Sequence, residues 1–383
     1  MLGVCMDYKN KNYGSKLQAL ATVRMFEELS LDYEIIRYNK RTPKFILKYL
    51  LRFFNIVFLN DRYDQVQRII EYRRHPGIKK LIDIRNAEMD SMDSGFDAHL
   101  SELYPSYGAL KRHCPERYDR LITCSDQLWS PSALGSGFYN LMFADEDMPK
   151  VSWASSFGVS RIPWYQIGRT RTYLNRIQNI SMRENRGAQI VEELTGKKVP
   201  VLMDPVFVFD RAAWDKIIPP ENPEWGDYVF CYFLGDNQEH RARVKHFASE
   251  KGLKIVTLRH LDRYIDKDEG FGDIAPYDVS PARFLNILRN ARYVCTDSFH
   301  GTAFSVIFEK PFAVFDRYSD RSSNSKNSRI DSLCENLGLE NQRCRGNEMP
   351  GEILEQDINY EKVGEKLSHY RSATRRFLKE NLT

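Results

Sequence analysis

A histidine and two small residues lie in the stretch 293–312, YVCTDSFHGTAFSVIFEKPF, where an apolar strand turns into an apolar helix. His300 is suited to proton transfer because imidazole titrates near neutral pH. Ser298 and Gly301 flank it, and the helix N-terminus supplies N–H donors with partial positive charge. We expect this turn at the carboxyl edge of a parallel sheet, where α/β proteins bind ligands. The stretch predicts a phosphate or carboxylate site beside a proton-transferring group.

Two arginines are candidates for holding that anion. Arg183 directly follows an apolar strand, and its guanidinium can bind a carboxylate or phosphate through two hydrogen bonds. A salt bridge to an acid such as Glu184 is the structural alternative. Arg329 and Asn327 lie in a polar, basic loop, 316–330, which can close over an anion and exclude water.

Another strand end carries the string SDQLW, 125–129, after an apolar strand at 118–124. We select Asp126 as a second catalytic candidate, with Ser125 and Gln127 as substrate-binding residues, because they lie at the predicted ligand edge. The alternative is that Ser125 or Asp126 only caps a helix.

Two more turns contribute candidates for substrate binding. Ser155 and Ser156 end a strand at 151–156, and their hydroxyls and nearby N–H groups can donate to an oxyanion. Asn12 and Tyr13 belong to an NYG turn after the first strand. The first turn of any α/β unit is the simpler interpretation of that string.

The elements that must position these residues form two α/β domains. Strand 1–6, helix 16–29 and strand 33–38 make a βαβ unit, which predicts a parallel sheet. The segment 219–227, rich in proline and polar residues, separates this domain from a second α/β unit. We therefore predict an N-terminal domain at 1–220 and a C-terminal domain at 227–383, two Rossmann-like domains facing across a cleft.

Three further segments complete these expectations. The stretch 87–110 has no clear period and is predicted to be a surface excursion. Asp204 and Pro205 follow an apolar strand, and we interpret Pro205 as fixing a turn rather than taking part in chemistry. The terminal helix, 361–382, is amphipathic and can pack back on the first domain.

An apolar segment, 44–59, carries a narrow basic stripe at Lys44, Lys48 and Arg52. It has two interpretations. It can lie in the membrane interface with its basic face toward the lipid head groups. It can also be a core or inter-domain helix whose lysines extend to solvent.

The composition limits the class of protein. The chain has 383 residues, 42% hydrophobic and 28% charged, which fits two folded domains. A net charge of +4 is too weak to predict nucleic-acid binding but suits anionic small molecules or an anionic membrane surface. Seven cysteines without a CxxC pair predict reduced thiols and no structural zinc. No signal peptide or spanning segment is evident, so we expect a cytoplasmic protein, with peripheral attachment to the plasma membrane as an option.

Several of these strings resemble the polysaccharide pyruvyl transferase family. The matching strings are NYG and LQA at 12–19, SDQLW at 125–129, SSFG at 155–158, SMRE at 181–184, Asp204-Pro205, TDSFHG with the later KPF at 296–312, and NSRI at 327–330. Two positions depart from the family pattern. Cys124 replaces the usual glycine before SDQLW, and Ser298 stands where some relatives have an arginine. Either an arginine contact comes from elsewhere, or Ser298 and nearby N–H groups suffice.

The resemblance implies an activity and an architecture. Members transfer a pyruvyl group from phosphoenolpyruvate to a sugar and release phosphate, and the family is thought to share the GT-B arrangement of two α/β domains. It implies phosphoenolpyruvate as co-substrate, no other cofactor and no metal. The acceptor would be a sugar of a bacterial surface polysaccharide or its polyprenyl-diphosphate-linked precursor, held by the N-terminal domain, with the donor on the C-terminal domain. A nucleotide-sugar glycosyltransferase and a non-catalytic carbohydrate-binding protein are the alternatives.

Overall fold

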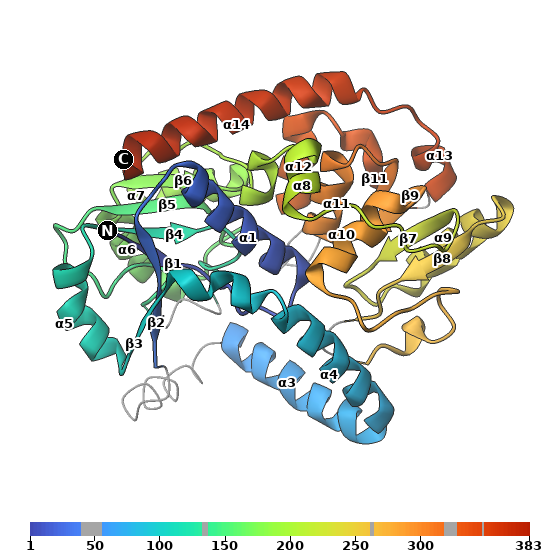
Figure 1. Ribbon diagram of the computed structural model, residues 1–383, viewed down its shortest axis with the longest axis horizontal. Helices are drawn as coiled ribbons and strands as arrows, with labels where there is room; N and C mark the ends of the chain where they lie inside the picture. Colours follow the sequence, from blue (N-terminus) through green and yellow to red (C-terminus); the bar gives the residue numbers. More distant parts are fainter. Residues whose placement is uncertain (40–55, 132–136, 261–263, 318–327, 347) are drawn as a thin grey trace.

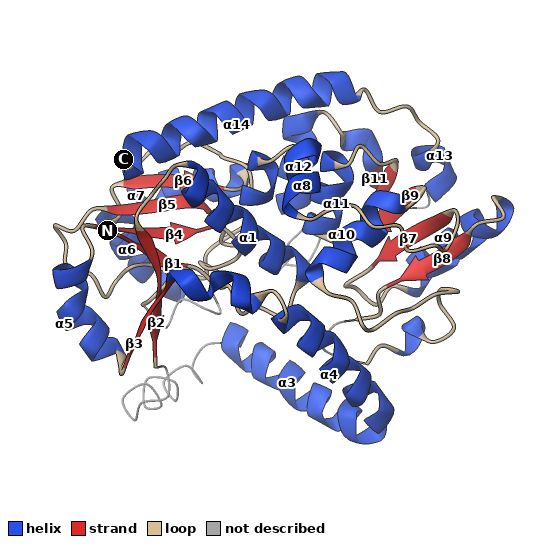
Figure 2. Cartoon of the chain, in the orientation of Figure 1, coloured by secondary structure: helices blue, strands red, loops and turns tan. Residues whose placement is uncertain are grey.

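Two parallel sheets with helices packed on both faces form the body of the protein (Figures 1 and 2). The computed structural model describes residues 1–39, 56–131, 137–260, 264–317, 328–346 and 348–383. The prediction of two Rossmann-like α/β domains is confirmed. Of the segment 44–59, only 56–59 falls within these ranges, as the start of helix α3.

The N-terminal domain contains the first sheet. Its elements are β1 (Leu2–Cys5), α1 (Tyr13–Glu28), β2 (Tyr33–Tyr38), α3 (Ile56–Arg74), α4 (Pro76–Asp90), η2 (Asp93–His99), β3 (Leu100–Tyr104), α5 (Tyr107–Arg117), β4 (Arg120–Cys124), β5 (Lys150–Ser155), η4 (Trp164–Gln166), α6 (Ile167–Arg176), β6 (Asn179–Met182), α7 (Asn185–Thr195), η5 (Pro205–Val208) and α8 (Arg211–Ile217). The strand order is β3-β2-β1-β4-β5-β6, and all neighbouring pairs are parallel. This is the dinucleotide-fold order, which reverses between β1 and β4.

The C-terminal domain contains the second sheet. Its elements are β7 (Tyr228–Tyr232), α9 (Gln238–Glu250), β8 (Lys254–Thr257), η6 (Asp266–Asp268), α10 (Pro281–Asn290), β9 (Tyr293–Thr296), α11 (Phe299–Ile307), β10 (Phe312–Phe315), α12 (Ser328–Leu337), η7 (Glu340–Gln342), β11 (Arg343–Cys344), α13 (Pro350–Leu354) and α14 (Tyr360–Leu382). The order β11-β10-β9-β7-β8 is also parallel and reverses between β7 and β9. In each domain, the loops that follow the two strands at the reversal run in opposite directions, to opposite faces of the sheet. They leave a crevice between them at the carboxyl edge of the sheet.

Helix α14 runs along both domains and ends beside the N-terminal strands (Figure 1). At its start, the Tyr360 hydroxyl donates to the Lys310 carbonyl at 2.6 Å, in the C-terminal domain. Further along, the Arg371 Nε donates to the Phe207 carbonyl at 2.9 Å, in the N-terminal domain. The last helix therefore ties the two domains together.

Two local predictions are wrong. The stretch 87–110 was expected to be a surface excursion, but it contains β3, the edge strand of the first sheet. The apolar strand expected before Asp204 is reduced to a single bridge between Met182 and Val201, and the 3-10 helix η5 follows it. Pro205 at the start of η5 lacks an N–H, so it cannot continue a sheet ladder there.

Candidate functional site

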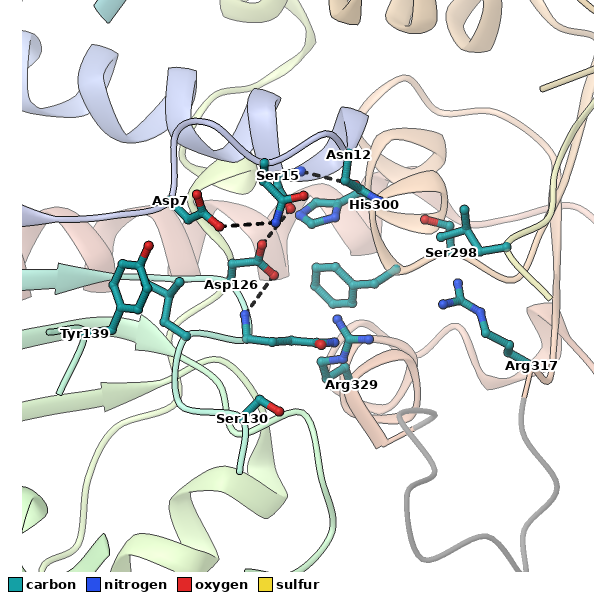
Figure 3. Close-up of a pocket in the computed structure, with 15 residues that line it drawn as sticks. Asp7, Asn12, Ser15, Asp126, Ser130, Tyr139, Ser298, His300, Arg317 and Arg329 are labelled. Carbon is teal, nitrogen blue, oxygen red and sulfur yellow. Dashed lines mark hydrogen bonds between the residues drawn. The ribbon is translucent and has the colours of Figure 1, made fainter. Parts of the chain in front are cut away.

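A cavity of about 370 Å³ opens between the domains, at the point where both strand orders reverse. We call it the cleft cavity (Figure 3). The loops after β1, β4, β7, β9 and β10 line it, together with the first turns of α1, α11 and α12. Its lining residues are Asp7, Asn10, Asn12, Ser15, Asp126, Gln127, Leu128, Ser130, Tyr139, Leu234, Ser298, Phe299, His300, Arg317 and Arg329.

An anionic group on the N-terminal domain faces this cavity. The Ser15 hydroxyl donates to Asp126 Oδ2 at 2.6 Å, and the Gln127 N–H donates to Asp126 Oδ1 at 2.8 Å. Asp126 has a φ of 65°, a conformation that costs energy for a residue other than glycine. Burial raises the pKa of Asp126, but the charges of Arg183 and His300 and these hydrogen bonds outweigh burial and lower its pKa overall. Asp126 is therefore ionised at neutral pH.

Cationic groups on the C-terminal domain face the same space. Arg329, in the first turn of α12, lies with its guanidinium 5.7 Å from the Phe299 ring centroid. With its side-chain oxygen toward Arg329, Gln127 accepts from both terminal nitrogens at 2.9 and 2.6 Å. Burial and the charge of Arg183 lower the pKa of Arg329 to about 10, so it remains protonated at neutral pH. Arg317 donates from Nη2 to the Asp297 carbonyl at 2.8 Å.

The turn before α11 is fixed by its own polar groups. Asp297 accepts from the N–H groups of Leu234 and Gly235, both at 2.7 Å, which joins the loops after β7 and β9. Ser298 caps α11 by accepting from the Gly301 N–H at 3.3 Å. A Cβ on Gly301 would lie 2.5 Å from Thr296 Oγ1, so glycine allows the helix to approach the strand.

Behind the cavity, Asp204 joins several predicted site residues. It accepts from the Ser125 hydroxyl at 3.0 Å and from Arg183 Nη1 at 2.7 Å, and its Oδ2 lies 3.6 Å from His300 Nε2. Burial raises the pKa of Asp204, but the nearby His300 and the charge and hydrogen bond of Arg183 lower it well below its ordinary range. No role was predicted for this buried carboxylate.

Arg183 lies in the same layer and does not line the cavity. Its side chain is 1% exposed, its Nη2 is 3.9 Å from Asp126 Oδ1, and its guanidinium is 4.8 Å from the Phe299 ring. Burial raises the pKa of Glu184 beside it, although Arg183 and Arg329 both act to lower that pKa. Arg183 is therefore buried among carboxylates, as the salt-bridge alternative predicted. Its direct contact with a ligand stays a prediction.

The structure brings together some of the candidates from the sequence and not others. The predicted residues that line the cavity are Asn12, Asp126, Gln127, Ser298, His300 and Arg329. Those buried outside its lining are Tyr13, Ser125, Ser155, Ser156, Arg183 and Gly301. Asn327 lies outside the described residues. Tyr13 stacks on Phe284 with ring centroids 4.8 Å apart, and the Ser156 hydroxyl donates to Glu184 at 2.9 Å.

Several residues of this region were not selected from the sequence, among them Asp7, Ser15 and Asp204, whereas Arg317 lies in the loop 316–330 that was predicted to close over an anion. Asp7, Ser15 and Arg317 line the cavity, and Asp204 lies behind it. The position of Asp7 after β1 is the signal that identified the other candidates, so the same rule would have found it. Within the described ranges no group of three or more His, Cys, Asp or Glu side chains could hold a metal ion. The predictions of no metal and no further cofactor remain untested.

Comparison with known proteins bears on both fold and family. A family model described as polysaccharide pyruvyl transferase matches residues 12–319. No curated protein in the comparison matches the chain.

The crystal structure of UDP-GlcNAc 2-epimerase from Neisseria meningitidis bound to UDP-GlcNAc aligns with a TM-score of 0.52 at 10% identity, over 100% of this chain and 98% of that one. The E. coli heptosyltransferase WaaC aligns with a TM-score of 0.39 at 10% identity, over 88% of this chain and 99% of that one. The epimerase similarity and the two parallel-sheet domains show a GT-B fold.

Proposed function

The chain belongs to the polysaccharide pyruvyl transferase family, and we propose that it transfers a pyruvyl group from phosphoenolpyruvate to a sugar. The acceptor is a sugar of a bacterial surface polysaccharide or of its lipid-linked precursor, the product is a pyruvate ketal, and phosphate leaves. The observation that carries this proposal is the charge of the cleft cavity. Arg317, Arg329 and His300 come from the C-terminal domain, whereas Asp7 and Asp126 come from the N-terminal domain.

A cavity with cationic side chains on one domain and carboxylates on the other suits one anionic and one neutral substrate. Phosphoenolpyruvate carries a phosphate and a carboxylate, which charged arginines and a helix N-terminus can bind. We assign it to the side of Arg317 and Arg329. A sugar hydroxyl is neutral and must lose a proton, so we assign the acceptor to the side of Asp126, an ionised carboxylate.

The proposed reaction has two additions at one carbon. His300 protonates the methylene carbon of phosphoenolpyruvate, which gives the central carbon oxocarbenium character. One sugar hydroxyl adds to that carbon and gives its proton to Asp126. The second hydroxyl then replaces the phosphate and closes the ketal. Of the two hydroxyl protons, one balances the proton now in the methyl group and the other leaves with phosphate. Arg329 and Arg317 stabilise the carboxylate and the departing phosphate.

Product analysis tests the reaction. The purified chain is incubated with phosphoenolpyruvate and candidate lipid-linked sugars, and we expect phosphate release that depends on the acceptor, with the mass of one ketal added to the sugar. Release of UDP from a nucleotide sugar, without phosphate release from phosphoenolpyruvate, would instead identify a glycosyltransferase. Neither release, with retained sugar binding, would identify a carbohydrate-binding protein.

Replacing Arg329 by glutamine is expected to weaken phosphoenolpyruvate binding about 10- to 100-fold, since a charge-assisted hydrogen bond to an anion contributes about 1.5–3 kcal/mol. The measurement is KM for phosphoenolpyruvate or direct calorimetric titration. Arg292→Gln is the matched control, because Arg292 is an exposed arginine of the same domain at the opposite end of β9. Equal affinities in the two variants would remove Arg329 from the donor site.

We also propose that the protein binds the surface of an anionic membrane, where a lipid-linked acceptor is found. Among the described helices, none is both long and apolar enough to cross a bilayer. Helix α3 instead exposes Leu59, Tyr63 and Val66, which are 40%, 64% and 53% exposed and share one helix face. Exposed basic residues follow at Arg73, Arg74 and Lys80. An apolar face beside cationic side chains is typical of helices that lie in a membrane interface.

Vesicle sedimentation tests this surface. We expect the protein to pellet with vesicles containing phosphatidylglycerol and to stay in solution with phosphatidylcholine alone. The double variant Tyr63→Asp, Val66→Asp should lose that binding. Trp164→Asp, which removes an 83% exposed aromatic residue elsewhere on the N-terminal domain, should keep it. Retained binding by the double variant would exclude α3 as the contact.

A further inference from the structure

We infer that Gly14 and Asp204, both in the N-terminal domain, are positioning residues for His300, which belongs to the C-terminal domain. The imidazole lies between them at the domain interface, so the domain that carries the proton-transferring group does not orient it alone. The effect on turnover rests on the proposed function, whereas the contacts themselves can be tested without it.

Gly14 provides the first contact. Asn12 caps α1 by accepting from the Gly14 N–H at 3.0 Å, so the backbone of the first turn is held in place. A Cβ on Gly14 would lie 2.1 Å from both Cγ and Nδ1 of His300. That separation is far inside van der Waals contact, and the neighbour is a ring close to its own backbone. Any side chain at this position must therefore displace the imidazole or separate the domains.

Asp204 provides the second contact. Its Oδ2 lies 3.6 Å from His300 Nε2, which is within ion-pair range but too long for a hydrogen bond. The Asp204 side chain is fully buried and is fixed by Arg183 and by the Val206 N–H at 3.2 Å. Hydrogen bonds between catalytic groups are often long before substrate binds, and they shorten in the complex. One edge of the imidazole thus meets the α1 backbone and its Nε2 faces a fixed carboxylate.

Tyr13, the neighbour of Gly14, adds a further contact between the two domains. Tyr13 is fully buried and stacks on Phe284 of α10, with the rings 6° from parallel. The start of α1 therefore docks on the C-terminal domain through two successive residues, Tyr13 and Gly14. Opening of the cleft would withdraw both Gly14 and Asp204 from His300.

Two Gly→Ala variants test the Gly14 contact. Gly14 is the second residue of α1 after Tyr13, and Gly108 is the second residue of α5 after Tyr107, so both follow a tyrosine and a polar cap. A Cβ on Gly108 would meet nothing closer than 3.7 Å. We expect Gly14→Ala to lower acceptor-dependent phosphate release about 100-fold, the effect of a small misplacement of a catalytic group. Gly108→Ala should retain full activity. Equal activities would overturn the inference for Gly14.

Thermal unfolding separates this inference from the proposed function. Gly14→Ala should lower Tm in the natural sequence, because the new methyl group meets the imidazole. In a His300→Gly background, which removes the Cβ of residue 300 at 2.5 Å as well as the ring, the same change should lower Tm by less. An equal Tm loss in both backgrounds would overturn the contact. If the unmodified protein releases no phosphate, the proposed function fails while this measurement still decides the contact.

Asp204→Asn tests the second contact with a side chain of the same size. We expect kcat to fall about 10-fold or more, because His300 loses its facing carboxylate, while KM for phosphoenolpyruvate stays within about twofold, because Asp204 does not line the cavity. Equal losses in kcat and in donor affinity would indicate a general structural role and overturn the assignment for Asp204. If the variant does not fold, the Gly14 variants decide the inference.

Discussion

Replacing His300 by glutamine is expected to lower kcat by roughly 10²- to 10⁴-fold, the usual contribution of a general acid or base. Glutamine occupies a similar volume and can donate a hydrogen bond, but it cannot deliver a proton at neutral pH. The buried pair of His300 with Asp204 would be lost as well. The measurement is acceptor-dependent phosphate release at saturating phosphoenolpyruvate.

A second histidine serves as the control for this variant. His246 lies in α9 of the same domain, is 61% exposed, and pairs with Glu250 of its own helix at 3.4 Å. His246→Gln should therefore retain full activity. If His300→Gln were as active as His246→Gln, the imidazole would have no part in proton transfer, even if the reaction is the proposed one.

Replacing Arg183 by methionine is expected to reduce the free energy of unfolding by about 3–5 kcal/mol, as for other buried ion pairs that lose one partner. The change leaves Asp204 and Glu184 buried without their nearest cation, since Arg183 lies 2.7 Å from one and 3.9 Å from the other. Urea denaturation at neutral pH measures the loss. Arg186→Met is the control, because Arg186 pairs with an exposed Glu193 and should lose at most about 1 kcal/mol.

The loss from Arg183→Met should depend on pH. In the unmodified protein the pKa of Asp204 is lowered by folding, so its ionised form adds stability above the ordinary carboxyl range. That stability is lost as the pH falls through the lower, folded-state pKa. Without Arg183, ionisation of Asp204 and Glu184 becomes costly, and protonation relieves the cost. The difference between variant and unmodified protein should therefore narrow at mildly acidic pH. A difference independent of pH would exclude the uncompensated charges as its cause.

Much of the fold could be predicted because buried parallel strands and amphipathic helices have distinct periods. The strand at Tyr33–Tyr38 has the bounds that its pattern indicates, and the terminal helix expected at 361–382 is α14, Tyr360–Leu382. Strand β3 was missed because it is an edge strand, and most of its side chains are at least partly exposed. Its sequence, LSELY, therefore lacks the continuous apolar run of the central strands.

The sequence predicted the site residues that follow regular strands and not those placed by the packing of the domains. The rule that ligands bind after parallel strands identified His300 and Asp126, which follow β9 and β4. The rule cannot decide which of the two arginines contacts the ligand. Arg183 lies behind Phe299, whereas Arg329 lines the cavity, and this difference arises only from the packing of the two domains. Asp204 follows no regular strand, so its approach to His300, almost a hundred positions later in the chain, has no local signal.

The helix that ties the domains also has a consequence for biosynthesis. Helix α14 leaves the ribosome after every strand of both sheets, yet its Leu378 and Leu382 belong to the apolar cluster that includes Phe26 of α1. Domains usually fold in order as they emerge during synthesis. The N-terminal part of this cluster therefore remains without the side chains of α14 until the rest of the chain has been translated.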